Sequence, residues 1–347
     1  MFGDRMVVAN ATGCSSIYGG SSPTCPYTKN AQGKGPAWAN SLFEDNAEFG
    51  YGMNLAYGQR RAKLADTIQE AIDLGVKGKL KAALTEWLEN RKSADVTKAL
   101  APVIEELLTP AIKSARGDLK VALTKIRDQK DCLIKKSIWI FGGDGWAYDI
   151  GYGGLDHVLA MGEDVNVLVL DTEVYSNTGG QASKATPTGA TAKFAAGGKR
   201  VKKKDLGMIA MSYGYVYVAQ CAMGSNKQQF LNAIVEAESY DGPSLIIAYA
   251  PCINHGINMS NSQLEEKKAV DSGYWHLYRY NPTLIGKENP FKLDSKDPTE
   301  SYRDFLLGET RYTSLQKAQP ELAEKLFERA EEENNNRLNN YKNLANK

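Results

Sequence analysis

Short runs rich in Val, Ile and Leu alternate along the chain with longer stretches of helical spacing. Apolar runs of strand length are typical of parallel strands that are covered on both faces. We therefore predict a single α/β domain over residues 1–347, with a doubly wound, mostly parallel sheet. The clearest candidate strands are Arg5–Asn10, Ser137–Phe141, Val165–Asp171, Tyr215–Ala219, Ser244–Ala250 and Tyr274–Tyr280.

Two regions depart from this alternation. Between residues 54 and 136, Ala, Leu, Lys and Glu recur with helical spacing, which predicts an excursion of two or three helices. Pro102 fits a helix start and Pro110 fits a kink. From residue 298 to 347 we expect a helical tail, in which the polar run 331–336 is solvated or frayed.

Composition excludes several classes of protein. A hydrophobic fraction of 42% argues against disorder, and a net charge of +1 gives no electrostatic case for nucleic acid or a membrane surface. No apolar run is long enough to span a bilayer, and the N-terminus does not resemble a signal peptide. Five widely spaced cysteines predict no disulfide framework and suit a reducing cytoplasm. The first strand begins so near Met1 that we expect further protein upstream or on another chain.

A glycine-rich turn follows the candidate strand Ser137–Phe141. Residues 142–145 read Gly-Gly-Asp-Gly, and a helix is predicted from about Ala147. Glycines allow close approach of a ligand, and the helix N-terminus behind them favours an anion. A carboxylate such as Asp144 repels phosphate, so its natural task is to hold a divalent cation that bridges to phosphate oxygens.

A second set of oxygen ligands follows the next strand. Thr172 lies 28 positions after Asp144, which is about the length of one helix and one strand. The Asp144 carboxylate, the Thr172 hydroxyl and a backbone carbonyl near Val174 would then meet at one sheet edge. Such hard ligands suit Mg²⁺ or Ca²⁺ bound to a diphosphate. The Gly-Gly-Asp-Gly turn alone is a weak signal, because Asp-Gly pairs are common in turns.

Four separated strings resemble the C-terminal, thiamine-diphosphate-binding part of the pyruvate:ferredoxin (flavodoxin) oxidoreductase family. They occupy residues 9–20, 142–151, 171–181 and 250–256, and the resemblance covers essentially the whole chain. It implies a thiamine diphosphate-binding fold. Most thiamine enzymes carry Asn at the second metal-ligand position, where this chain has Thr172.

The resemblance implies specific site residues. Asp144, Thr172 and the Val174 carbonyl would bind Mg²⁺. Asn177 would lie beside the reacting centre as a hydrogen-bond donor, although an Asn before Thr-Gly-Gly also suits a simple turn. The residues expected to contact the cofactor are Cys14, Gly143, Asp144, Gly145, Trp146, Thr172, Glu173, Val174, Tyr175, Ser176 and Asn177.

The resemblance also implies an iron–sulfur cluster. Cys14 and Cys252 would supply two of the four thiolates of a [4Fe–4S] cluster, and the other two belong to a Cys-x-x-Cys upstream of this sequence. Sequence spacing alone would not suggest a cluster, and free cysteines are commonly just small buried residues. The remaining cysteines, Cys25, Cys132 and Cys221, match no ligand position.

The implied activity is oxidative decarboxylation of pyruvate to acetyl-CoA. Coenzyme A accepts the acetyl group, and [4Fe–4S] clusters pass electrons to ferredoxin or flavodoxin. The family is cytoplasmic and usually homodimeric, and its pyrimidine-binding and other iron–sulfur domains lie outside this sequence, so we expect the isolated chain to be inactive. The alternatives are a subunit of another 2-oxoacid:ferredoxin oxidoreductase and a catalytically silent, truncated binding module.

A basic run and one histidine leave alternatives open. Five of the six residues 199–204 are Lys or Arg, which suits docking of an acidic ferredoxin, contact with a phosphate of coenzyme A, or simply a solvated loop. His255 follows Cys252 closely, but a histidine in such a loop more often forms a hydrogen bond than binds a metal.

Overall fold

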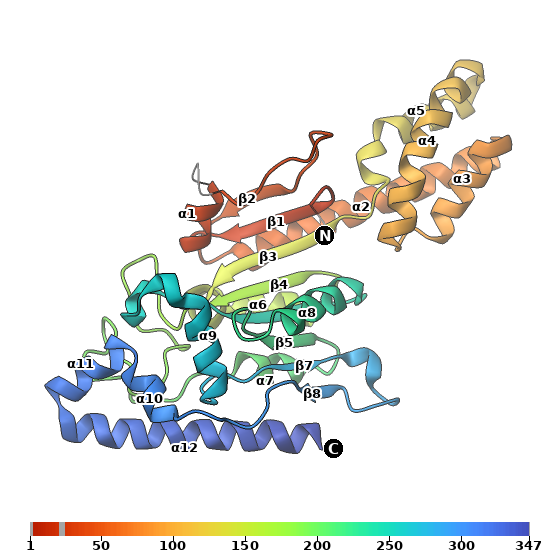
Figure 1. Cartoon of the computed structure of the whole chain (residues 1–347). Helices are drawn as coiled ribbons and strands as arrows, with labels where there is room; N and C mark the ends of the chain where they lie inside the picture. Colours follow the sequence, from red (N-terminus) through yellow and green to blue (C-terminus); the bar gives the residue numbers. More distant parts are fainter. Residues whose placement is uncertain (1–2, 21–24, 347) are drawn as a thin grey trace. The chain divides into compact units, whose positions relative to one another are not determined.

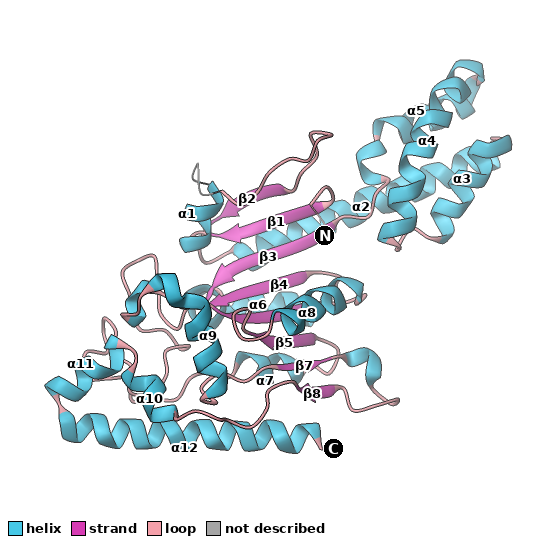
Figure 2. Cartoon of the chain, viewed as in Figure 1, coloured by secondary structure: helices cyan, strands magenta, loops and turns pink. Residues whose placement is uncertain are grey.

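The computed structural model describes residues 3–20 and 25–346. They divide into two compact units. The first, here called the helical unit, comprises Met1–Val7, Thr28–Ala37 and Tyr51–Ile138; the second, the sheet unit, comprises Val8–Tyr27, Trp38–Gly50 and Trp139–Lys347. Figure 1 labels the elements along the chain, and Figure 2 distinguishes helices from strands.

The strands are β1 (Met6–Ala11), β2 (Ala37–Ser41), β3 (Ser137–Gly143), β4 (Asn166–Asp171), β5 (Tyr217–Cys221), β6 (Ser244–Tyr249), β7 (Tyr278–Tyr280) and β8 (Phe291–Leu293). The α-helices are α1 (Cys14–Gly20), α2 (Asn46–Asp73), α3 (Gly78–Glu89), α4 (Ala94–Ser114), α5 (Gly117–Asp128), α6 (Tyr152–Ala160), α7 (Leu206–Met211), α8 (Lys227–Ser239), α9 (Ser262–Asp271), α10 (Tyr302–Leu307), α11 (Thr310–Ala318) and α12 (Pro320–Ala345).

The helical unit contains α3, α4, α5 and most of α2, packed around a core of its own. Leu84 and Trp87 are fully buried there, and the Trp87 indole N–H donates to the Leu133 carbonyl over 2.8 Å. The prediction that Pro102 begins a helix is wrong, because both Pro102 and Pro110 lie inside α4. The helix begins earlier because the Ser93 hydroxyl caps it by accepting from the Val96 amide.

The sheet has the strand order β2-β1-β3-β4-β6-β5-β7-β8. Strands β3, β4, β6 and β5 pair in parallel, whereas β7 is antiparallel to β5 and β8 is antiparallel to β7. This arrangement confirms the predicted doubly wound, mostly parallel α/β fold. The sequence analysis did not predict β2 or β8.

The register of the central strands brings their carboxyl ends to one edge. Gly143 of β3 pairs with Leu170 of β4, and Asp171 of β4 pairs with Tyr249 of β6. The arrows of β3 and β4 point toward the same edge in Figure 2. The loops that follow these three strands therefore emerge side by side, as in other open α/β sheets that bind ligands at this edge.

The tail of the chain forms α10, α11 and α12. We expected residues 331–336 to be solvated or frayed; they are not frayed, but Glu332, Asn335 and Asn336 are exposed to solvent. These residues lie in the middle of α12. The buried Asn334 amide donates to the Gly273 carbonyl over 2.6 Å, and Glu333 accepts from the Thr188 hydroxyl over 2.6 Å. Polar side chains hold this part of the helix against the sheet unit because they find buried partners.

Within the part of the chain that the structure describes, no helix combines the length and the apolar character needed to cross a membrane.

A candidate cofactor site at the carboxyl ends of the strands

A cavity of about 290 Å³ opens at the carboxyl edge of the sheet. The segments at or after the ends of five strands, β1, β2, β3, β4 and β6, contribute to its lining. Its lining consists of Thr12, Gly13, Cys14, Ser15, Tyr18, Phe43, Gly143, Asp144, Gly145, Leu170, Thr172, Val174, Tyr175, Ser176, Asn177, Thr178 and Ala250. The volume and the mixture of apolar walls with a few polar groups are typical of a small-molecule site.

Three oxygen atoms from two strand ends come together in this cavity. The Thr172 hydroxyl lies 2.8 Å from Asp144 Oδ1 and 3.0 Å from the Val174 carbonyl oxygen. Asp144 Oδ2 accepts from the Ser183 hydroxyl over 2.6 Å. The side chains of residues 144 and 172, which the sequence placed on neighbouring turns, are thus in direct contact.

The Asp144 carboxylate lies in an environment that disfavours its charge. It is 1% exposed, and burial together with the nearby Asp171 carboxylate raises its pKa to about 7. Hydrogen bonds from Ser183 and Thr172 act in the opposite direction but do not compensate fully. A cation at this carboxylate would offset the cost of burial.

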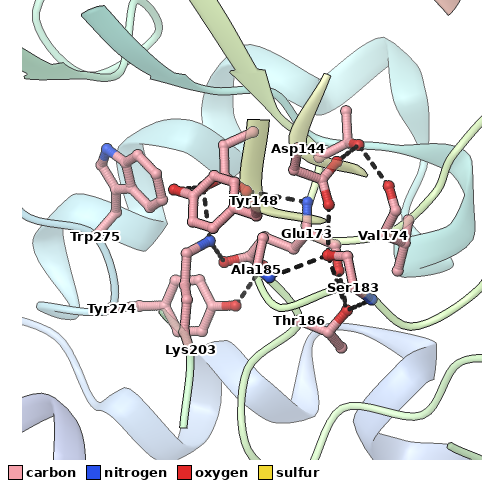
Figure 3. Close-up of polar contacts among 12 residues, drawn as sticks. Asp144, Tyr148, Glu173, Val174, Ser183, Ala185, Thr186, Lys203, Tyr274 and Trp275 are labelled. Carbon is pink, nitrogen blue, oxygen red and sulfur yellow. Dashed lines mark hydrogen bonds and ion pairs between the residues drawn. The ribbon is translucent and has the colours of Figure 1, made fainter. Parts of the chain in front are cut away.

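A buried ionic cluster surrounds Glu173, and Figure 3 shows Lys203 beside this residue. Lys203 Nζ lies 2.8 Å from Asp171 Oδ2 and 3.0 Å from Glu173 Oε1, and Arg311 Nη2 lies 2.7 Å from Glu173 Oε2. Burial alone would raise the pKa of Glu173, but Lys203 and Arg311 outweigh it and hold this pKa at about 2. The cluster therefore places fixed, compensated charges directly behind the loop that carries Thr172.

Two residues expected at the cofactor do not line the cavity. The Glu173 carboxylate belongs to the ionic cluster, where it also accepts from the Tyr274 hydroxyl over 2.5 Å. The Trp146 side chain is fully buried, and a β-carbon added to Gly142 would collide with its ring. Glu173 also has a φ of 60°, a left-handed conformation that is unusual for a residue with a side chain.

Position 145 requires a glycine because the Tyr175 ring lies close to its backbone. A β-carbon there would lie 2.6 Å from the Tyr175 ring, which forms a wall of the cavity. The chain after Gly145 forms a π-helix over Gly145–Ile150 before α6 begins, whereas the sequence predicted a helix from about Ala147. Such π-helical turns are frequent at functional sites.

Ser176 joins the two cysteines that were expected to bind a cluster. Its hydroxyl lies 2.8 Å from Cys252 Sγ and 3.4 Å from Cys14 Sγ. The backbone N–H of Asn254 lies 3.4 Å from the same Cys252 sulfur. Asn177, the next residue of the loop, lines the cavity. Cys132 and Cys221 are buried and Cys25 is exposed.

His255 connects the loop after β6 to the loop after β4. Its ring is fully buried, and Nε2 donates to the Thr172 carbonyl over 2.8 Å, since that oxygen can only accept. On the other side, Nδ1 lies 3.5 Å from Glu309 Oε1. The histidine thus forms a hydrogen bond, as its position in a loop suggested.

Sequence reasoning missed several polar residues of the site. Ser183, Asp171 and Lys203 were not singled out, although Asp171 ends a strand and was a detectable signal. No group of three or more His, Cys, Asp or Glu side chains suited to a metal occurs among the described residues. The oxygen set at Asp144 is of a different kind, because a hydroxyl and a backbone carbonyl supply two of its three oxygens.

Comparison with known families agrees with this geometry. The family described as "Thiamine pyrophosphate enzyme, C-terminal TPP binding domain" matches residues 124–248. This range contains the Gly-Gly-Asp-Gly turn and the whole Thr172–Asn177 loop. The fold is accordingly an α/β thiamine diphosphate-binding fold.

Curated relatives match nearly the entire chain. The pyruvate:ferredoxin oxidoreductase of Moorella thermoacetica is 65% identical over 99% of this chain, which spans 30% of that protein. The pyruvate-flavodoxin oxidoreductase of Klebsiella pneumoniae is 57% identical over 99% of this chain, which spans 29% of it. The chain thus corresponds to about a third of these relatives.

A third relative carries a different acceptor in its name. The pyruvate dehydrogenase [NADP(+)] of Cryptosporidium parvum is 46% identical over 99% of this chain, which spans 20% of that protein. Proteins named for different electron acceptors therefore share this part, while pyruvate is common to the three names.

Proposed function

Since the chain carries the C-terminal, thiamine-diphosphate-binding part of the pyruvate:ferredoxin (flavodoxin) oxidoreductase family, we propose that it anchors this cofactor through Mg²⁺ for the oxidative decarboxylation of pyruvate. One observation carries the proposal above all. The Thr172 hydroxyl lies 2.8 Å from Asp144 Oδ1 and 3.0 Å from the Val174 carbonyl at the carboxyl ends of β3 and β4.

The residues present fit the metal. Mg²⁺ favours hard oxygen ligands and usually binds through one carboxylate together with phosphate oxygens. Asp144, Thr172 and the Val174 carbonyl would hold it. Burial disfavours the charged form of the Asp144 carboxylate, and a bound cation would offset this cost. Ser183 would keep the carboxylate oriented by its hydrogen bond to Oδ2.

When bound, thiamine diphosphate supplies the carbon nucleophile that permits decarboxylation of a 2-oxo acid. The protein's own contribution is to orient the cofactor and the substrate and to shield them from water. Tyr175 and Leu170 provide apolar walls, and the Asn177 amide, which lines the cavity, would donate a hydrogen bond to charge developing on the substrate oxygen.

We further propose that Cys14 and Cys252 supply two of the four thiolates of a [4Fe–4S] cluster. Their sulfur atoms both contact the Ser176 hydroxyl, which supports a common location beside the cofactor loop. Two thiolates are fewer than a cubane cluster uses, so the other ligands would come from the remainder of the complete protein.

Coenzyme A, a ferredoxin or flavodoxin acceptor, homodimerisation and a cytoplasmic location remain predictions. The chain spans about a third of its relatives, and we propose that the pyrimidine-binding and iron–sulfur domains implied by the family resemblance complete the activity. We therefore expect no turnover from this chain alone. The alternative of another 2-oxoacid is not favoured, because the relatives of highest identity quoted above are named for pyruvate.

Cofactor binding is tested by calorimetry on the full chain. Thiamine diphosphate should bind only with Mg²⁺ present, and the Asp144→Asn variant should lose this Mg²⁺-dependent binding. Asp128→Asn makes the same change at an exposed aspartate outside the cavity, and this matched control should retain the binding. Metal-independent binding that Asp144→Asn leaves unchanged would contradict the assignment.

Catalysis is tested by co-expression with the missing domains of a close relative. The complex should reduce a dye with pyruvate and coenzyme A, and 2-oxoglutarate should be a poor replacement. Turnover by the isolated chain would overturn the proposed division of the active site.

A further inference from the structure

A second cavity, separate from the cofactor site, lies between the basic run and the C-terminal helix. Its volume is about 640 Å³, and residues 199–209 face it from one side and α12 from the other. In Figure 1 α12 runs past α7 at this end of the sheet unit. The lining residues are Lys184, Lys199, Val201, Lys202, Lys203, Lys204, Asp205, Met208, Ile209, Glu333, Asn336, Arg337 and Asn340.

Four of the cations that line this cavity have no carboxylate partner. Lys199 Nζ donates to the Ser183 carbonyl and Lys204 Nζ donates to the Tyr148 carbonyl, both of which are neutral acceptors. Within the described ranges, the side chains of Lys202 and Arg337 form no hydrogen bond or ion pair. By contrast, Lys184 is paired with Asp149 and Lys203 with Asp171, so these two charges are compensated.

The two acidic residues in the lining are engaged elsewhere. Asp205 accepts from the Met208 amide over 3.0 Å and from the Tyr341 hydroxyl over 2.7 Å. Glu333 accepts from the Thr188 hydroxyl over 2.6 Å and from Arg329 Nε over 2.8 Å. Glu333 is offset by Arg329, whereas Asp205 has only neutral donors and its charge acts on Arg337. The four cations without a carboxylate partner therefore exceed the one carboxylate of the lining that no cation pairs.

Burial is the largest influence on two of these lysines. It lowers the pKa of Lys199 to about 8; the Asp149 carboxylate acts in the opposite direction, and the neighbouring Lys203 and Lys184 add to the lowering. Burial together with Lys184 also lowers the pKa of Lys204 to about 8. An anion in the cavity would raise both pKa values toward the ordinary value of a lysine.

We propose that this cavity binds a small molecule with a diphosphate-type anion, whose phosphates are held by Lys199, Lys202, Lys204 and Arg337. Three lysines of the basic run and Arg337 of α12 on the other side offer several donors to the oxygens of such a group. Val201, Met208 and Ile209 offer an apolar surface for a less polar remainder of the ligand. The proposal does not depend on the function of the cofactor site.

The test is calorimetric titration of the full chain with inorganic diphosphate. EDTA in the buffer keeps divalent cations from loading the cofactor site. The double variant Lys202→Ala/Arg337→Ala should weaken binding by about tenfold or more, because two charge-assisted contacts are removed. The control Lys317→Ala/Lys325→Ala removes two exposed lysines outside the cavity and should bind like the parent chain.

A second titration with adenosine diphosphate distinguishes the source of the anion. Tighter binding than inorganic diphosphate indicates a nucleotide-like ligand that uses the apolar surface, and equal affinity indicates the free inorganic ion. Equal binding to both double variants, no binding at millimolar diphosphate, or binding only of an acidic protein would overturn the proposal. Unchanged melting temperatures of the variants verify that they fold.

Discussion

The hydroxyl of Ser176 lies 2.8 Å from the sulfur of Cys252. Ser176 belongs to the same loop as Thr172 and Asn177, so a single segment contacts both the oxygen set at Asp144 and the sulfur of a proposed cluster ligand. Asn254 adds a backbone N–H 3.4 Å from that sulfur. Contacts of this kind tune the reduction potential of iron–sulfur centres.

Replacing Ser176 should change the potential of the cluster in the complete, reconstituted enzyme. Ser176→Ala removes a donor to Cys252, which destabilises the reduced, more negative state and lowers the reduction potential. Ser176→Thr keeps the hydroxyl and should restore it. Redox titration followed by electron paramagnetic resonance measures the shift, and identical potentials in the three proteins would exclude this role.

Replacing Asp144 should stabilise the metal-free chain, although the same residue is proposed to bind the metal. Its pKa of about 7 lies above the ordinary 3.8, so the folded chain prefers the protonated form and loses stability as pH rises from about 4 through 7. Asp144→Asn should therefore gain thermal stability over the metal-free parent, with the gain increasing with pH. Melting temperatures at pH 5, 6.5 and 8 measure it, and a pH-independent difference would contradict the prediction.

Replacement of two adjacent lysines should change the free energy of unfolding by very different amounts. Lys203→Met leaves Asp171 and Glu173 buried with one cation fewer and should cost about 3–5 kcal/mol of unfolding free energy. Lys202→Ala, at an exposed neighbouring position, should change it by no more than about 0.5 kcal/mol. Denaturant unfolding of both variants checks the contrast, and equal losses would show that the ionic cluster is not structural.

Acid should destabilise the chain through His276. Burial, with Arg337 and Lys342 nearby, lowers the pKa of this histidine to about 3. Its stabilising contribution is therefore complete above the unfolded value of about 6.5 and is lost as pH falls toward 3, by up to about 1.4 kcal/mol per pH unit. His276→Leu should flatten this dependence, and His157→Gln, at an exposed position, should not. Unfolding free energies between pH 7 and 5 decide between them.

The central strands and the meeting of Asp144 with Thr172 could be predicted because both follow from local patterns. A continuous apolar run marks a buried parallel strand, and parallel strands deliver their following loops to one edge. Strands β2 and β8 could not be recognised in this way. They are short, and β8 contributes only Phe291, Lys292 and Leu293, which give too few residues for a periodic signal.

The ionic cluster could not be predicted because the sequence of a basic run does not reveal which of its side chains point into the protein. Lys202 and Lys203 are neighbours in one basic run, yet the first is exposed and the second is buried between two carboxylates. Only the tertiary position of Asp171, Glu173 and Arg311 decides which lysine turns inward. The same reason explains why residues 331–336 are not frayed: the Asn334 amide donates to the buried Gly273 carbonyl, which lies far away in the sequence.

Glu173 sits in a left-handed backbone conformation and is held there by partners from remote parts of the sequence, Lys203, Tyr274 and Arg311. A transplant of the loop that carries Thr172 into a different scaffold would therefore need these three partners as well. We expect a short peptide copy of the loop to lose the left-handed conformation at Glu173.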